Sequence, residues 1–252
     1  MNIDFSGKTV VVTGGTSGIG LAIAEKFLES NAKVAVCGRN QRKIDNLLEK
    51  WTEENCEGYA KAVDVTSRIQ LSQFADQVED RFGGIDIWIN NAGVYPQYAV
   101  IDTPESVWDE TININLKSVY LGSMIAQQKI VKRGGGVIIN ASSFAAVMPS
   151  AGSGVYAASK AGVQSLTKTL AAELAVENIR VNGYIPGVIQ TNMTEKVIEA
   201  KNNALISQLA IKRIGTSEEV ANAVLFLCSD QASYITGTFI EVSGGKFCVQ
   251  NP

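Results

Sequence analysis

The sequence predicts an α/β fold in which a single doubly wound parallel sheet carries helices on both faces. Two observations lead to this class. Apolar runs of strand length alternate with amphipathic segments of helix length along the chain, a pattern typical of right-handed crossovers between parallel strands. The sequence also shows no internal repeat, low-complexity tract or proline-rich linker, so one domain over residues 1–252 is the simplest organisation.

Strands and helices alternate regularly in the N-terminal half. The first strand lies in KTVVVTGG, and the first helix in GIGLAIAEKFLESN, where apolar residues recur at helical spacing. The next helix, NQRKIDNLLEKW, opens at Asn40, a residue type that caps helix N-termini. A third helix runs from Ser67 to Phe82 and ends at Gly83-Gly84. The remaining strands of this half are AKVAVCGR, GYAKAVDVT and IDIWINNAG.

The C-terminal half continues the alternation. Helices are predicted from Glu105 to about Val131, over residues 153–176 and from Glu218 to Leu227. The strands of this half are GGGVIINASS, NIRVNGYIPG and GTFIEVSGG. Residues 191–213 are polar and only weakly periodic, and we expect them to form a mobile lid over a substrate.

Composition and charge exclude several classes of function. A net charge of -3 and a pI near 5.2 argue against nucleic acid or an anionic membrane as a partner. The absence of histidine excludes Ser-His and Cys-His nucleophile pairs and histidine-ligated metals. We expect a cytoplasmic protein without a signal peptide or metal. Its cysteines lack the spacing of a zinc site or a redox pair: Cys37, Cys56, Cys228 and Cys248.

A glycine-rich turn, TGGTSGIG, follows the first strand and opens the first helix. Glycines at positions 14, 18 and 20 allow the backbone to approach a ligand closely, and a helix N-terminus presents N–H groups to phosphate. An ordinary strand–helix turn would also favour flexible residues. The surrounding parallel sheet nevertheless favours nucleotide binding here, as in Rossmann-like domains.

The end of the second strand indicates which dinucleotide binds. An acidic residue there would bind the ribose 2′-hydroxyl and repel a 2′-phosphate. Here the strand ends in Cys37-Gly38-Arg39, with Arg42 and Lys43 nearby, and a guanidinium suits a phosphate. NADP(H) is therefore favoured, and NAD(H) remains possible because a solvated basic loop would have the same composition.

Tyr156 and Lys160 are the residues best suited to proton transfer. Spaced four apart in a predicted helix, they share one face, among small residues that leave room for a ligand. Two neighbouring surface residues would have the same spacing. Since histidine is absent, however, acid–base chemistry must come from Tyr, Lys, Asp or Glu. A cation close to the phenol would lower its pKa toward neutrality.

Several motifs together resemble the short-chain dehydrogenase/reductase family, in order and at family spacing over nearly the whole chain. They are Thr13-Gly14-x3-Gly18-x-Gly20, Asn90-Asn91-Ala92-Gly93, Ser143 with Tyr156 and Lys160, and Pro186-Gly187. The resemblance implies hydride transfer between a nicotinamide cofactor and a ketone or secondary alcohol.

The resemblance also implies a catalytic tetrad. Tyr156 would exchange the proton with the substrate oxygen, and Lys160 would lower the phenol's pKa and hold the nicotinamide ribose. Ser143 would hydrogen-bond the substrate oxygen, and Asn115 would hold a water that connects Lys160 to solvent. The less favoured neighbours, by spacing, are Ser142 for the serine and Asn113 for the asparagine.

Cofactor and substrate residues follow from the same resemblance. Asp64 would contact the adenine, and the backbone of Ile189 and the hydroxyl of Thr191 would hold the carboxamide. The implied cofactor-binding residues are Gly14, Thr16, Ser17, Gly18, Ile19, Gly20, Arg39, Asp64, Val65, Asn91, Ala92, Gly93, Tyr156, Lys160, Pro186, Gly187, Ile189 and Thr191. The candidate substrate residues, mostly apolar or neutral and without a basic cluster for a sugar phosphate, are Tyr95, Pro96, Gln97, Ser143, Val147, Met148, Gln190 and Met193.

Within the family, the chain is most similar to bacterial 3-oxoacyl-thioester reductases. One departure concerns the acidic acyl carrier protein: those reductases commonly carry a docking arginine where this chain has Glu177-Asn178. Lys129, Lys132 and Arg133 could replace it, although Glu177 would repel an acidic partner.

Two other functions are compatible with the motifs. The alternative is a sugar or polyol dehydrogenase that uses NAD(P)+. A non-catalytic nucleotide sensor on the same fold is disfavoured by the intact tetrad. Family members are usually tetramers formed through the two long helices and the last strand, so we expect a homotetramer.

Overall fold

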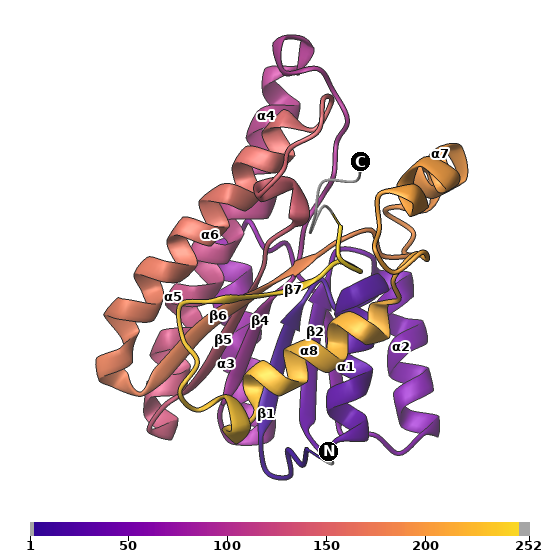
Figure 1. Cartoon of the computed structure of the whole chain (residues 1–252). Coiled ribbons are helices and arrows are strands. Elements are labelled where there is room, and N and C mark those ends of the chain that lie inside the picture. Colours follow the sequence, from indigo (N-terminus) through magenta and orange to yellow (C-terminus); the bar gives the residue numbers. More distant parts are fainter. Residues whose placement is uncertain (1–2, 247–252) are drawn as a thin grey trace.

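The structure is a computed structural model that describes residues 3–246, so Cys248 lies outside the described residues. It confirms the predicted fold class. Seven parallel strands form one sheet in the order β3-β2-β1-β4-β5-β6-β7, with helices on both faces (Figure 1). The strands are β1 (Thr9–Thr13), β2 (Lys33–Gly38), β3 (Gly58–Ala62), β4 (Ile87–Asn90), β5 (Gly136–Ala141), β6 (Ile179–Pro186) and β7 (Phe239–Val242).

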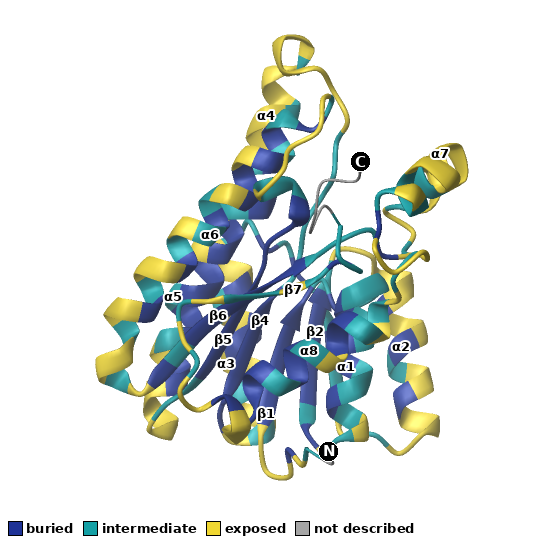
Figure 2. Cartoon of the chain, in the orientation of Figure 1, coloured by how far each residue is buried: buried dark blue, intermediate teal, exposed yellow. Residues whose placement is uncertain are grey.

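Each face of the sheet has its own apolar core, and the central strands are buried between the two, whereas the edge strands β3 and β7 are mostly only partly buried (Figure 2). On one face, Phe27, Trp51 and Val224 pack from three helices: α1 (Gly18–Glu29), α2 (Gln41–Glu53) and α8 (Ser217–Cys228). On the other face, Phe74, Ile125 and Ala171 pack from α3 (Arg68–Phe82), α5 (Ser118–Ile130) and α6 (Gly154–Leu174). Short 3-10 turns cover Val100–Asp102, Val131–Arg133, Phe144–Ala146, Ala175–Glu177 and Asp230–Ala232.

Local sequence explains where the helices begin and end. The side chain of Asn40 accepts a hydrogen bond from the Lys43 N–H at 3.1 Å, as expected for the N-cap of α2. Ser67 caps α3 in the same way. That helix ends at Gly83, whose φ of 87° lies in the left-handed region that favours glycine.

Two segments differ from the sequence prediction. The long helix predicted from Glu105 is interrupted: α4 (Glu105–Ile112) is joined to α5 by a π-helical turn, Asn113–Lys117. The weakly periodic segment 191–213 contains a helix, α7 (Glu195–Ser207), which is kinked at Lys201. None of its residues, all of them described, is buried, and α7 projects from the body of the domain (Figures 1 and 2). Apolar periodicity is weak there because the helix has no core to face.

A buried polar network fixes the middle of the sheet. Adjacent strands β4 and β5 place Asn90 opposite Asn140, and the Asn90 amide donates to the Asn140 Oδ1 at 2.9 Å. Asn90 also donates to Ser123 of α5 at 3.1 Å and accepts from the Trp88 indole at 2.8 Å. Asn140 in turn donates to Thr167 of α6 at 2.9 Å. These hydrogen bonds connect β4 and β5 to each other and to α5 and α6, close to the carboxyl ends of the two strands.

We predict that Thr167→Val lowers the free energy of unfolding by about 1–3 kcal/mol, because it leaves the buried Asn140 amide without its acceptor. Thr169→Val is the matched control, since Thr169 makes an exposed hydrogen bond on the same helix. It should change stability by no more than about 0.5 kcal/mol. Urea denaturation of both variants measures the difference. If the two variants lost the same free energy of unfolding, the buried network would make no specific contribution to stability.

Candidate active site

The glycine-rich turn forms a tight cradle at the carboxyl end of β1. Gly14 and Gly18 have φ values of 66° and 56°, which favour glycine. A side-chain carbon at Gly20 would overlap the Asn91 amide and the Gly14 carbonyl oxygen. The side chain of Ser17, at the N-cap of α1, makes no capping hydrogen bond, and the first turn holds no acidic residue. The helix N-terminus is therefore left to an anionic ligand, such as a pyrophosphate.

Asn91 ties this turn to the neighbouring strand end. Its amide donates to the carbonyl oxygens of Thr13 and Gly14, at 3.0 and 3.2 Å. The Thr13 hydroxyl accepts the N–H groups of Asn91 and Ala92. The buried Tyr184 of β6 donates its hydroxyl to the Asn91 Oδ1 at 2.8 Å. Sequence reasoning missed Tyr184, although its place near the carboxyl end of a strand was a signal for a site residue.

Two pockets meet at Tyr156. The first, of about 320 Å³, follows the sheet edge and is the expected dinucleotide site. It contains every predicted cofactor-binding residue except Gly187 and Ile189. Gly187 lines the second pocket. Ile189 is buried, and its carbonyl oxygen accepts a hydrogen bond from the Thr194 hydroxyl at 2.5 Å. Ile189 is not among the described residues that line either pocket.

The second pocket, of about 450 Å³, is the candidate substrate site. It contains Tyr95, Gln97, Ser143, Met148 and Met193 as predicted. Among the residues that line it in the described chain, Pro96, Val147 and Gln190 do not occur. Gln190 is instead exposed, with its N–H bonded to the Gly215 carbonyl oxygen at 2.9 Å.

Two lysines of this pocket were missed from the sequence: Lys201 of α7 and Lys246 after β7. The expectation of a mostly apolar or neutral pocket without basic residues therefore needs correction. The position of Lys246, beyond the carboxyl end of the last strand, was an available signal. Lys201 gave none, because its segment showed no clear periodicity.

The phenol of Tyr156 lies between Ser143 and Tyr95. Tyr95 packs edge-on against it, with ring centroids 4.7 Å apart. Burial raises the pKa of Tyr156 above its usual value, and a hydrogen bond from Ser143 opposes the rise. The Ser143 oxygen also accepts the Ala145 N–H at 3.1 Å. Ser142, the rival serine, points its hydroxyl to the Lys160 carbonyl oxygen at 3.3 Å.

Lys160 is 4% exposed, and its ammonium donates to the Ala141 carbonyl oxygen at 2.8 Å. Burial lowers the pKa of Lys160 to about 8. The ammonium lies 5.9 Å from the centroid of the Tyr156 ring. The expected lowering of the Tyr156 pKa by Lys160 is not seen, because desolvation of the phenol dominates. A protonated phenol is the form that donates a proton.

Asn115 lies fully buried in the π-helical turn. Its Oδ1 accepts the Val94 N–H at 2.8 Å, and its amide donates to the Val94 carbonyl oxygen and to Ser159. A side-chain carbon at Gly93 would come within 3.3 Å of Asn115 and 3.5 Å of the Lys160 ammonium. Both groups therefore lie close to the backbone of Gly93. The water-holding role of Asn115 stays a prediction.

Arg39 lines the first pocket where the second strand ends, as predicted, and its side chain is 62% exposed. The guanidinium lies 3.8 Å from a carboxylate oxygen of Glu110 on α4. Asp64 lines the same pocket, and one of its carboxylate oxygens accepts the N–H and the hydroxyl of Thr66, at 2.9 and 2.8 Å.

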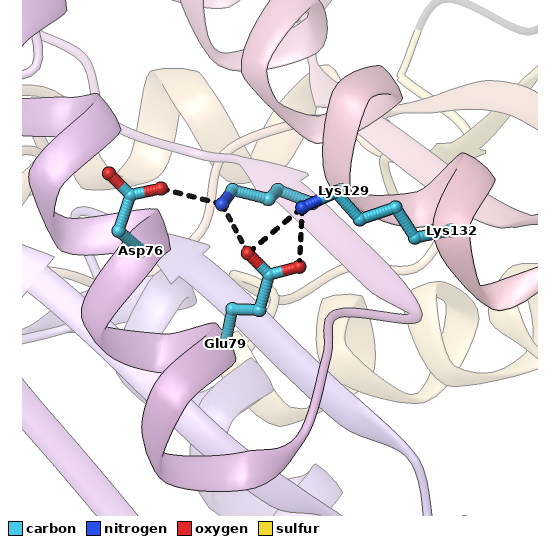
Figure 3. A network of polar contacts seen from close by, with 4 residues as sticks. All are labelled: Asp76, Glu79, Lys129 and Lys132. Atoms are coloured by element: carbon cyan, nitrogen blue, oxygen red, sulfur yellow. Dashed lines mark hydrogen bonds and ion pairs between the residues drawn. The ribbon is translucent and has the colours of Figure 1, made fainter.

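The basic residues considered for carrier-protein docking are engaged by carboxylates (Figure 3). Lys129 is 8% exposed and bonds Asp76, at 2.6 Å, and Glu79 of α3. Lys132 bonds the same Glu79 at 2.9 Å, and the two lysines hold the pKa of that carboxyl below its usual value. Arg133 pairs similarly with Asp86 at 3.4 Å. This surface therefore presents little free positive charge.

Residues 3–246 offer neither a metal-binding cluster nor a membrane-spanning helix. No group of three or more acidic or cysteine residues within 3–246 is placed to hold a metal ion. None of the helices in that range is long and apolar enough to span a membrane. Burial raises the pKa of the Cys37 thiol to about 12, which makes it a packing residue rather than a nucleophile.

Comparison with known proteins agrees with this geometry. Residues 14–246 match a family model described as enoyl-(acyl carrier protein) reductase. The chain is 38% identical to the 3-oxoacyl-[acyl-carrier-protein] reductase FabG of Thermotoga maritima, over 95% of this chain and 97% of that protein. It is 37% identical to a 3alpha-hydroxysteroid dehydrogenase of Mediterraneibacter gnavus, over 94% of this chain and 96% of that protein. A putative gluconate dehydrogenase from Agrobacterium tumefaciens superposes with a TM-score of 0.94 at 27% identity, covering 99% and 100%.

The pocket at the carboxyl edge of the sheet shares Tyr156 with a second pocket. Together with the matching family and relatives, this arrangement defines an oxidoreductase that uses a nicotinamide cofactor. The chain belongs to the short-chain dehydrogenase/reductase family. Its relatives are named as reductases and dehydrogenases.

We predict that Tyr184→Phe weakens dinucleotide binding about three- to tenfold, because the Asn91 amide loses the hydroxyl that orients it against the glycine turn. Tyr234→Phe is the matched control, since Tyr234 is fully exposed. Titration of each variant with reduced cofactor, followed by fluorescence, gives the dissociation constants. Identical constants for the two variants would contradict this role of Tyr184.

Proposed function

We propose that the protein reduces a ketone to a secondary alcohol with a nicotinamide cofactor and that a 3-oxoacyl thioester is the first candidate substrate. The observation that carries the proposal is the position of Tyr156, shared by the two pockets. The raised pKa of its phenol favours the protonated form, which suits reduction. The family description refers to enoyl reduction, but an oxygen-directed Ser143–Tyr156 pair suits a carbonyl better.

The chain's own residues then have distinct tasks. The bound nicotinamide supplies or accepts the hydride. Ser143 and Tyr156 donate hydrogen bonds to the carbonyl oxygen, and Tyr156 transfers its proton to that oxygen as the alcohol forms. Lys160, near the Gly93 backbone, holds the nicotinamide ribose and passes a proton toward Tyr156. Asn115 holds the backbone around Val94 and a water that links Lys160 to solvent.

We propose NADP(H) as the preferred cofactor, with NAD(H) possible. Arg39 supports this proposal because it lines the pocket where the adenosine ribose would lie. Its partner Glu110 is a competing carboxylate, and at 3.8 Å on an exposed surface the pair is weak enough for a phosphate to displace.

The first substrate class is a 3-oxoacyl thioester, in line with the names of several relatives. The ion pairs of Lys129 and Lys132 argue for a soluble thioester rather than a carrier protein. A hydroxysteroid, sugar or polyol is the alternative, supported by the relatives named for such substrates. In this scheme α7 acts as the lid. Exposed apolar residues such as Trp108 of α4 and Val176, in the turn after α6, suit a homotetramer.

We predict that Tyr156→Phe lowers kcat/KM for ketone reduction at least about 1,000-fold and changes the cofactor dissociation constant by no more than about twofold, because only the proton donor is lost. Tyr234→Phe should retain full activity. The assay is acetoacetyl-CoA reduction, with NADPH and NADH side by side. If the Tyr156→Phe variant retained turnover, Tyr156 could not be the proton donor.

We predict that Arg39→Ala lowers kcat/KM for NADPH about 10- to 100-fold and that for NADH no more than about twofold, because only NADPH carries the 2′-phosphate. Arg42→Ala is the control, since Arg42 is exposed and does not line the described pocket. Glu110→Gln should raise the NADPH preference. Equal losses with both cofactors in Arg39→Ala would overturn the assignment.

A further inference from the structure

The proposed proton donor packs against a second tyrosine. Tyr95 meets Tyr156 edge to face, with the ring centroids 4.7 Å apart and the ring planes at 73°. Both residues are half-buried, and both line the substrate pocket together with Ser143. Edge-to-face packing is a favoured geometry for aromatic side chains, because the positive edge of one ring meets the negative face of the other.

The helix that carries Tyr156 holds the ring only weakly by itself. Tyr156 lies in the first turn of α6, where its neighbours Gly152 and Gly154 have no side chain, and Ser153 at the N-cap makes no capping hydrogen bond. The first turn of a helix is its least constrained part, because its N–H groups lack partners within the helix. The orientation of the Tyr156 ring therefore depends on groups outside α6.

Hydrogen bonds hold the segment around Tyr95 from both sides. The buried Asn115 accepts the Val94 N–H at 2.8 Å and donates to the Val94 carbonyl oxygen at 3.0 Å. Three residues beyond Tyr95, the Tyr98 N–H donates to the Gly152 carbonyl oxygen at 3.0 Å. The segment is thus anchored to the π-helical turn on one side and to the start of α6 on the other.

The same asparagine also reaches the backbone of Tyr156. Its amide donates to the Ser159 hydroxyl at 3.1 Å, and that hydroxyl donates to the Tyr156 carbonyl oxygen at 2.6 Å. A closed circuit of contacts therefore leads from the Tyr156 ring through Tyr95, Val94, Asn115 and Ser159 back to Tyr156. Moving one tyrosine ring relative to the other would disturb several of these contacts at once.

We infer that Tyr95 is a positioning residue: its ring holds the phenol of Tyr156 in the orientation from which the proton is donated to the substrate. This inference rests on the proposed function and deepens it, because it assigns a task to a side chain outside the predicted tetrad. Misplacement of a reacting group by about 1 Å can slow a reaction about 100-fold. Burial raises the pKa of Tyr156, and the neighbouring Tyr95 adds to this rise.

Steady-state reduction of acetoacetyl-CoA with saturating NADPH separates positioning from substrate binding. We expect Tyr95→Ala to lower kcat about 10- to 100-fold and to change KM for acetoacetyl-CoA no more than about threefold. Tyr95→Phe keeps the ring and should retain kcat within about threefold. Tyr95→Leu, which leaves a smaller gap than alanine does, should lose kcat as well. If KM rose while kcat stayed unchanged, Tyr95 would be a substrate contact and the inference would be wrong.

Tyr98→Ala is the matched control. Tyr98 lies on the same segment and is 43% exposed, but it does not belong to the described lining of either pocket. Its backbone hydrogen bond to Gly152 does not require the side chain, so kcat should stay within about twofold of the wild-type value. Equal losses in Tyr98→Ala and Tyr95→Ala would show that any disturbance of the segment is sufficient, which overturns a specific role for Tyr95.

Fluorine NMR tests the positioning without any turnover. The seven tyrosines of the chain are replaced by 3-fluorotyrosine, and the Tyr156 resonance is identified by its loss in Tyr156→Phe. Its chemical shift would move merely because a neighbouring ring is lost, so the informative quantities are the line width and the difference in shift between H2O and D2O. We expect Tyr95→Ala to change the line width and to increase the H2O–D2O difference, because the ring gains freedom and contact with water. Tyr95→Phe should leave both quantities near their wild-type values.

The two measurements distinguish failure of this inference from failure of the proposed function. If the wild-type protein reduces acetoacetyl-CoA and Tyr95→Ala matches it in kcat, ketone reduction stands and the inference is wrong. If the wild-type protein reduces no ketone, the proposed function fails, and the fluorine signal still decides whether Tyr95 positions the Tyr156 ring. An unchanged line width and H2O–D2O difference in Tyr95→Ala would overturn the inference in either case.

Discussion

The hydrogen bond between the side chains of Asn90 and Asn140 is the interaction on which the site depends most. It joins the two central strands immediately before the chain leaves the sheet toward Asn91 on one side and Ser143 on the other. The same two asparagines donate hydrogen bonds to Ser123 and Thr167, which fixes the positions of α5 and α6 along the strands. Because a parallel sheet brings all its carboxyl ends to one edge, this local bond helps to position the residues that line the two pockets.

Burial, rather than pairing of charges, sets the protonation states in the site. Desolvation keeps the phenol of Tyr156 protonated and makes the ammonium of Lys160 easier to deprotonate. Because free tyrosine and lysine have similar pKa values, these opposite shifts move the two pKa values apart and leave the phenol the weaker acid. This arrangement suits a proton path that ends at a carbonyl oxygen, and it needs neither histidine nor a metal.

Basic side chains lie both on the surface and in the pocket. On the surface, carboxylates from α3 pair with Lys129 and Lys132 (Figure 3), and Arg133 pairs with Asp86. Lys201 and Lys246 line the candidate substrate pocket.

The sequence by itself determined the parallel sheet and most residues of the first pocket, because strand and helix periods and the glycine turn are local signals. It also indicated Ser143, Tyr156 and Lys160 through their joint spacing. Only the tertiary structure decided the contact of Tyr184 with Asn91, the position of Lys246 at the second pocket and the helical form of residues 195–207. Those features depend on contacts between strand ends far apart in the sequence, and in α7 on a helix that faces no core and so leaves no apolar period to read.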